Sequence, residues 1–144
     1  TVSLNQQSQA ELWSAFRCGR RMEVFIIKES DESIEAQLTK HWDSAYIHTR
    51  KFIKNSDYLE IHDLMSGDFD NFNSAFHFHP ECKVILNADT IIVKREHVEL
   101  KIEAAGGKIS LEDYNFAEDF NILRTSSKIN ISFNKELSVK ISWK

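Results

Sequence analysis

Two histidines and a glutamate lie close together in the segment His77-Phe78-His79-Pro80-Glu81. Alternate side chains of an extended chain point to the same face, so these three could form a two-His-one-carboxylate metal site. Pro80 interrupts such a strand because it has no backbone N–H to donate. We therefore favour histidines that are hydrogen-bonded at the end of a strand beside core phenylalanines, and we assign no metal ligand in the chain.

Other residues that could move protons lack suitable neighbours. His62 stands beside Asp63, but adjacent residues of a strand point to opposite faces, so the pair is a poor catalytic dyad. The three tyrosines have no nearby positive charges in the sequence to lower a phenol pKa of about 10. A glycine-rich phosphate loop and a nucleophile elbow are also missing from the sequence. We assign no catalytic residue.

The elements that would position these side chains are β-strands, because apolar and polar residues alternate with a period of two. The alternation is clearest in 137–143, 98–104 and 34–38. Further segments rich in Ile, Val, Phe, Tyr and Thr suit a pleated surface; they are Met22–Lys28, Ala45–Lys54, Tyr58–Leu64, Phe72–Phe78, Lys83–Leu86, Thr90–Lys94, Lys108–Leu111 and Lys128–Phe133. The sequence predicts about eleven strands.

Short turn segments separate these strands, which makes neighbouring strands antiparallel. Examples are Asn87-Ala88-Asp89, Ala105-Gly106-Gly107 and Asn134-Lys135. So many strands would expose apolar faces and long edges in one flat sheet, and packing two sheets face to face removes both problems. We predict an all-β fold, an antiparallel two-sheet β-sandwich that occupies 1–144 as a single domain.

Composition excludes several partner classes. The chain has 18 basic and 22 acidic residues and a net charge of −4, so it lacks the positive field of a nonspecific nucleic-acid binder. No apolar run reaches the roughly 18 residues that span a bilayer, and we expect neither nucleic acid nor membrane as a partner. Cys18 and Cys82 could form one bridge, but a domain of this size does not need one and we favour free thiols.

Four segments, in order, resemble a known family of polysaccharide lyases. Residues 1–21, which end in Phe16-Arg17-Cys18-Gly19-Arg20-Arg21, are similar to the opening of the β-domain of heparinase II/III-like lyases and related alginate lyases. Asp63-Leu64-Met65-Ser66-Gly67 is similar to the family's Asp-x-x-x-Gly turn. Phe76-His77-Phe78-His79-Pro80 resembles its Phe-His-Leu-His-Pro strand, and 114–131 resembles a Tyr…Phe-Gly segment with Asn121 in place of Gly.

The resemblance implies that the chain is the C-terminal β-sandwich of a larger enzyme. In such enzymes a helical toroid domain upstream supplies most catalytic residues, and an acidic uronic-acid polysaccharide is cleaved by β-elimination. It implies a chain that is inactive alone, and a divalent metal, zinc or calcium, in the parent protein but no cofactor in this part. It also implies a periplasmic or extracellular location, with a cytoplasmic one open for relatives that serve surface-polysaccharide synthesis.

Four residues near the start are carried over by position as candidates for substrate binding: Gln6, Gln9, Trp13 and Arg17. An interdomain contact or a strand-end hydrogen bond is the alternative role for each. The alternative function is a non-catalytic carbohydrate-binding or interaction module, which the aromatic content and the basic segment 17–21 would suit. Strong exposure of Trp13, Trp42 or Trp143 would favour that alternative, because sugars stack on exposed aromatic faces.

Overall fold

The fold is all-β and antiparallel, as the alternation predicts. A computed structural model describes residues 2–4, 11–14, 17–19, 22–40, 46–67 and 69–143. All regular secondary structure in these ranges is β-strand. The strands are β1 (Val2–Leu4), β2 (Glu11–Ser14), β3 (Arg17–Gly19), β4 (Glu23–Glu29), β5 (Ser33–Lys40), β6 (Tyr46–Lys54), β7 (Tyr58–Ser66), β8 (Phe72–His77), β9 (Lys83–Asn87), β10 (Thr90–Arg95), β11 (Val98–Asp119) and β12 (Ile122–Trp143).

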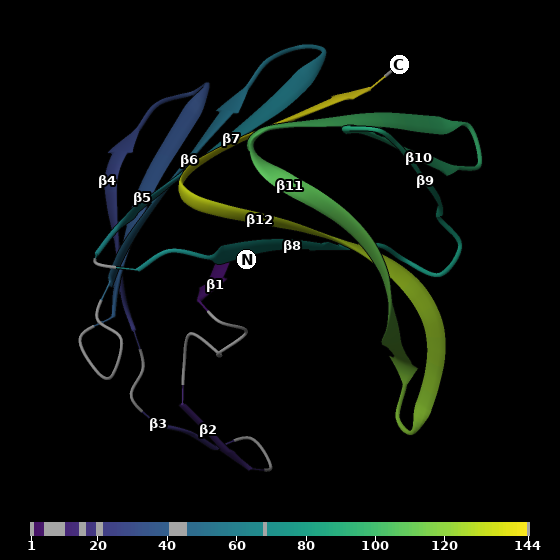
Figure 1. Ribbon diagram of the computed structural model, residues 1–144, viewed down its shortest axis with the longest axis horizontal. Coiled ribbons are helices and arrows are strands. Elements are labelled where there is room, and N and C mark those ends of the chain that lie inside the picture. The colour runs from purple at the N-terminus through teal and green to yellow at the C-terminus, as the bar shows by residue number, and fades with distance from the viewer. Residues whose placement is uncertain are drawn as a thin grey trace.

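Two bent strands build both layers of the molecule. β11 and β12 pair along most of their length, with one register shift between Ala117 and Asp119 and a second one, at the bend, between Ala105 and Gly107. On one side of this second shift β12 also pairs with β7, through Glu136–Ser142, and on the other side it pairs with β8, through Lys128–Phe133. One sheet of ten strands therefore folds back on itself into two layers (Figure 1). The two layers of the predicted β-sandwich therefore belong to one continuous hydrogen-bonded sheet and not to two separate sheets.

The two layers differ in width. The upper layer has the order β4-β5-β6-β7-β12-β11-β10-β9. The lower layer, as described, contains β1, β8 and the other halves of β12 and β11. The sheet is open, with β4 and β9 at the two ends of the upper layer, and β2 and β3 form a separate two-stranded ribbon.

Two of the predicted turns are wrong. Ala105-Gly106-Gly107 and Asn134-Lys135 do not separate strands but lie within β11 and β12, at the bend. Gly106 adopts a φ of 91°, and a Cβ added to it would lie 2.7 Å from the backbone oxygen of Glu136. Glycine suits a tight turn and a sharp bend for the same reason, because it tolerates positive φ and close backbone approach.

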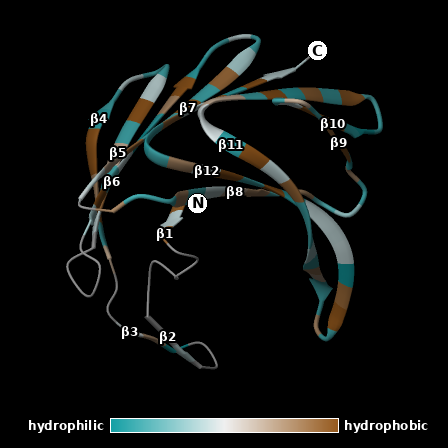
Figure 2. Ribbon diagram, in the orientation of Figure 1, coloured by the Kyte–Doolittle hydropathy of each residue, from teal (hydrophilic) through white to brown (hydrophobic). Residues whose placement is uncertain are grey.

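The core lies between the layers and is centred on Phe72 of β8. Its ring contacts Tyr46 of β6 edge-on at 5.9 Å between centroids and Phe133 of β12 at 6.0 Å. Hydrophobic bands alternate with hydrophilic ones along β11 and β12, as the inward and outward faces require (Figure 2). The other buried apolar residues are Val2, Leu4, Ile61, Met65, Ile91, Val93, Ile102, Ile129, Ile131, Leu137 and Val139.

A buried charged cluster closes one part of this core. The Nε2 atom of His48 lies 2.6 Å from Oδ1 of Asp63, and Arg50 donates two hydrogen bonds to the same carboxylate at 2.6 and 2.8 Å. The prediction that His62 is a poor partner for Asp63 is confirmed. The partner is His48, which the pairing of β6 with β7 brings beside Asp63. Burial alone would raise the pKa of Asp63, but the hydrogen bonds from His48 and Arg50 outweigh it and hold this pKa below its usual value.

Replacing Gly106 should destabilise the fold. The substitution Gly106→Ala places a Cβ against the Glu136 oxygen at a positive φ, and we expect a loss of about 2 kcal/mol in the free energy of unfolding. Urea denaturation measures it, with Ala105→Ser at the exposed neighbouring position as the control. Equal stability of the two variants would contradict the role of Gly106 in the bend.

Acid should weaken the fold through Asp63. Its pKa is lower in the folded chain than in the unfolded one, so its stabilisation is complete above the unfolded value of about 3.9 and is lost as pH falls through the folded value. At neutral pH the free energy of unfolding of the Asp63→Asn variant should be lower than that of the unaltered chain by about 3 kcal/mol. Below about pH 4 the variant should lose less of this free energy than the unaltered chain does. Urea midpoints across this range test it, with exposed Asp113→Asn as the control. An unchanged acid profile in Asp63→Asn would refute the assignment.

Candidate functional site

A polar groove lies on the outer face of the lower layer. Strand register places its side chains in rows across β8, β12 and β11: His77, Lys128 and Glu112 form one row, and Ala75, Asn130 and Ser110 form the next. The hollow that they line has a volume of about 380 Å³. The full set of lining residues is Ser3, Asn73, Ala75, His77, Ser110, Glu112, Lys128, Asn130 and Ser132. We call this surface the polar groove.

The same strand positions that build the core also fix the groove. On β12, Ile129, Ile131 and Phe133 are buried between the layers, so the intervening residues 128, 130 and 132 point to the opposite face. Hydroxyl, amide, imidazole, ammonium and carboxylate groups therefore share one face over three strands. Such a set can both donate hydrogen bonds to, and accept them from, a ligand rich in hydroxyl groups.

Charges within the polar groove influence one another. Lys128 Nζ lies 3.3 Å from a carboxylate oxygen of Glu112, and Ser110 donates to the other oxygen at 3.2 Å. Hydrogen bonds from Asn130 first, and from Lys128 next, lower the pKa of Glu112. Burial, together with the positive charge of Lys128, lowers the pKa of His77, which favours the neutral form of its imidazole.

Aromatic rings continue the polar groove beyond His77. The Tyr114 ring contacts the His77 ring edge-on at 4.8 Å between centroids, and Phe116 lies 6.5 Å from Tyr114 and 5.1 Å from His79. The Tyr114 hydroxyl donates a hydrogen bond of 2.7 Å to the carbonyl of Phe78. This bond holds the half-buried Tyr114 phenol in place beside His77.

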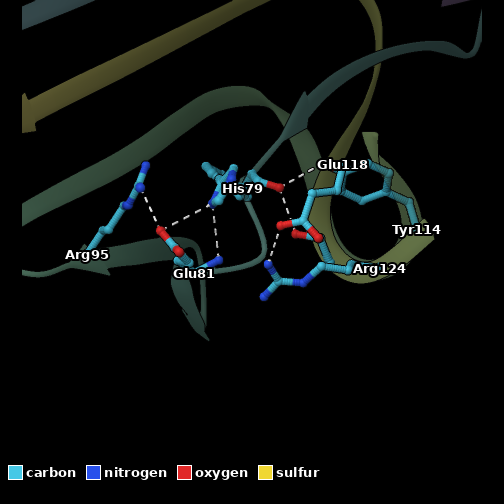
Figure 3. Close-up of polar contacts among 8 residues, drawn as sticks. His79, Glu81, Arg95, Tyr114, Glu118 and Arg124 are labelled. Atoms are coloured by element: carbon cyan, nitrogen blue, oxygen red, sulfur yellow. Dashed lines mark hydrogen bonds and ion pairs between the residues drawn. The ribbon is translucent and has the colours of Figure 1, made fainter. Parts of the chain in front are cut away.

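The geometry around His79 explains the histidine motif without a metal. The Nδ1 atom of His79 accepts a hydrogen bond from the backbone N–H of Glu81, and the Glu81 carboxylate pairs with Arg95 (Figure 3). His77 points instead to Tyr114 and the polar groove. Among the residues that the structure describes, no group of three His, Cys, Asp or Glu could hold a metal ion.

Two of the four predicted substrate-binding residues can be located. Trp13 and Arg17 lie on the paired strands β2 and β3, and both are exposed, Trp13 by 63%. The Trp13 indole covers Gly19, where an added Cβ would lie 2.5 Å from the ring. Gln6 and Gln9 fall outside the described residues, as does Trp42, while Trp143 is 38% exposed. The roles of Gln6, Gln9, Trp13 and Arg17 in substrate binding stay predictions.

Sequence reasoning missed the polar groove. The signal was present in 128–132, where Lys128, Asn130 and Ser132 alternate with two isoleucines. It indicated a half-buried strand, but not that the polar sides of three strands meet in one hollow.

Cys18 and Cys82 are free thiols, as favoured from the sequence. No helix in the described ranges is long and apolar enough to cross a membrane.

Comparison with known proteins places the chain in a family. The model of the heparinase II/III-like C-terminal domain matches residues 1–144. The chain belongs to the heparinase II/III-like family. This match confirms the resemblance that the ordered sequence segments indicate. A comparison with curated protein sequences found no match.

Solved structures of two lyases share the fold. The heparan sulfate lyase HepC from Pedobacter heparinus superposes with a TM-score of 0.72 at 12% identity, and the match covers 99% of this chain and 23% of that chain. A heparinase III gene product superposes with a TM-score of 0.69 at 12% identity, over 85% of this chain and 22% of that chain. The chain thus spans less than a quarter of each of these structures, which contain further domains.

Removing the charge of Lys128 should raise the pKa of His77. The positive charge of Lys128 disfavours the imidazolium form, so Lys128→Gln should move this pKa upward toward its ordinary value of about 6.5. Titration of the His77 ring resonances by NMR measures the change. Lys101→Gln, on β11 in the upper layer, is the control and should leave His77 unaltered. An unchanged His77 titration in Lys128→Gln would show that the two groups do not interact.

Proposed function

We propose that this heparinase II/III-like domain is the substrate-binding, non-catalytic part of a lyase that cleaves uronic-acid polysaccharides by β-elimination. The family match over the whole chain carries this proposal, and the polar groove supports it. In the proposed parent protein, an upstream helical toroid domain supplies the catalytic residues, and the ligands of a zinc or calcium ion lie outside the described part of this chain. We place the parent in the periplasm or outside the cell.

The chemistry of β-elimination explains what such a domain would contribute. A base removes the proton at C5 of the uronate, an acid assists departure of the oxygen at C4, and a 4,5-unsaturated sugar results. The polymer must first be held in register beside those groups. Lys128 offers a cation for a uronate carboxylate, while Asn130 and the serines of the polar groove offer hydrogen bonds to hydroxyl groups.

The described residues suit binding better than proton transfer. The Tyr114 hydroxyl is bonded to the Phe78 carbonyl, and the His77 ring packs against Tyr114. Neither group has a partner residue in the groove that would position it as an acid–base pair. We therefore assign substrate binding to the polar groove, and the chain alone is proposed to be inactive.

One observation favours a second candidate function. Trp13 is 63% exposed, which leaves much of its ring free to stack on a sugar. A non-catalytic carbohydrate-binding module needs such a ring and no other domain for its function. In that case the chain would bind polysaccharide without any lyase activity in the longer protein.

A β-elimination assay tests the proposal and separates the two candidates. The chain and the full-length parent protein are incubated in parallel with alginate, heparan sulfate and glucuronan, and the ultraviolet absorbance of newly formed unsaturated uronate is followed. We expect activity in the parent alone, together with polymer binding by both proteins. Binding by both without activity in either would favour the module, and activity of the isolated chain would overturn its non-catalytic role.

Opposite charge changes in the polar groove sharpen the binding measurement. Lys128→Gln removes the cation and should weaken binding of an acidic polymer by about tenfold. Glu112→Gln removes a negative charge beside Lys128 and should strengthen the same binding, because repulsion of the polymer carboxylates is relieved. Ser142→Ala, on the outer face of the upper layer, is the matched control. Equal affinity in all three variants would remove the polar groove from the proposal.

A further inference from the structure

The upper layer extends well beyond the lower layer at one side. The upper layer continues from β7 through β6 and β5 to β4, whereas β1 is the last strand of the lower layer that the structure describes on this side. The mismatch is visible in Figure 1, where β4 and β5 lie to the left of β1 and β8. Part of the inner face of the upper layer therefore lies outside the described two-layer core.

Strand register shows which side chains occupy this inner face. Val24 pairs with Leu38, and Leu38 pairs with His48, which belongs to the buried charged cluster. Ile26 pairs with Ala36 in the same way. Val24 and Ile26 consequently point to the same side as the core, yet each is 61% exposed.

A hollow lies where the lower layer stops. Its volume is about 200 Å³, and it is bounded by Val2 of β1 and by the inner face of β4, β5 and β6. Most of the residues that line it are apolar: Val2, Val24, Ala36, Leu38 and Phe52 accompany Gln37, His48 and Arg50. Strand β4 also stands out as mostly hydrophobic in Figure 2.

The outer face of the same strands has a different character. Phe25 pairs with Gln37, and Gln37 donates a hydrogen bond of 3.3 Å to Thr49 of β6. In this row polar Gln37 and Thr49 lie between two exposed apolar residues, Phe25 and Leu64. Strand β5 shows the contrast between the faces most clearly: Ile34, Ala36 and Leu38 lie on its inner face, and polar residues alternate with them on its outer face. Such alternation is the pattern of a sheet covered on one side only.

We infer that an apolar β-segment of the parent polypeptide, outside residues 1–144, covers the inner face of β4 and β5 and continues the lower layer. A β-segment fits because the hollow adjoins a layer of strands, and side chains of another strand would interdigitate with Val24, Ile26 and Leu38. The parent polypeptide is the source because the matched lyase structures are more than four times as long as the matched region. The inference rests on the proposal that this chain is part of such a longer lyase.

Cysteine labelling tests this inference in the full-length parent. With Cys18 and Cys82 replaced by serine and alanine, single cysteines are introduced by Ile26→Cys on the inner face and Phe25→Cys on the outer face. Both positions are exposed, so circular dichroism should show an unaltered fold. In the isolated chain a maleimide should modify both cysteines at similar rates. In the parent, the Ile26→Cys thiol should react slower by a factor on the order of ten or more, while the Phe25→Cys thiol keeps its rate.

Each other outcome overturns the inference. Equal reactivity of the Ile26→Cys thiol in the isolated chain and in the parent would mean that nothing in the parent covers this face. Protection in the isolated chain that increases with protein concentration would identify a second copy as the occupant. The labelling needs neither polysaccharide nor catalysis, so a parent that lacks lyase activity can still show the protection, and failure of the proposed function is distinguishable from failure of this inference.

Discussion

The bend of β11 and β12 is the constraint on which the rest of the structure depends. Both strands change direction near Gly106, where a positive φ and a contact too close for any side chain leave glycine as the residue without strain. Since β12 pairs with β7 on one side of the bend and with β8 on the other, the bend converts one sheet into two facing layers. Phe72 and Tyr46 can meet across the core only because the sheet returns over itself.

The polar groove and the core are two sides of the same strand segment. Between Lys128 and Phe133, inward residues pack in the core beside Phe72, while outward residues line the polar groove and present hydrogen-bonding groups. A rigid strand, held by neighbours on both edges, is a precise support for such groups, whereas a loop would let them move. The polar groove therefore has the rigid support that the proposed binding of a polysaccharide needs.

The sequence predicted the strands because alternation is a local signal, and it could be read from segments such as 137–143. It could not distinguish a bend from a turn at Gly106, because both need the same backbone freedom. Long-range register was also out of reach: the contact of His48 with Asp63 and the row of His77, Lys128 and Glu112 join residues from different strands. The family resemblance came from ordered short segments, which residues 1–144 retain despite 12% identity to the lyases of known structure.

The central position of β12 also has a consequence for how the protein is made. Its residues 136–142 pair with β7, at 58–64, and its residues 128–133 pair with β8, so contacts far apart in sequence close both layers. During synthesis the earlier strands leave the ribosome first and must wait for β12 with their pairing edges uncovered. Such dependence on distant contacts predicts slow folding, and in the cell the earlier strands are exposed to wrong pairing until β12 emerges.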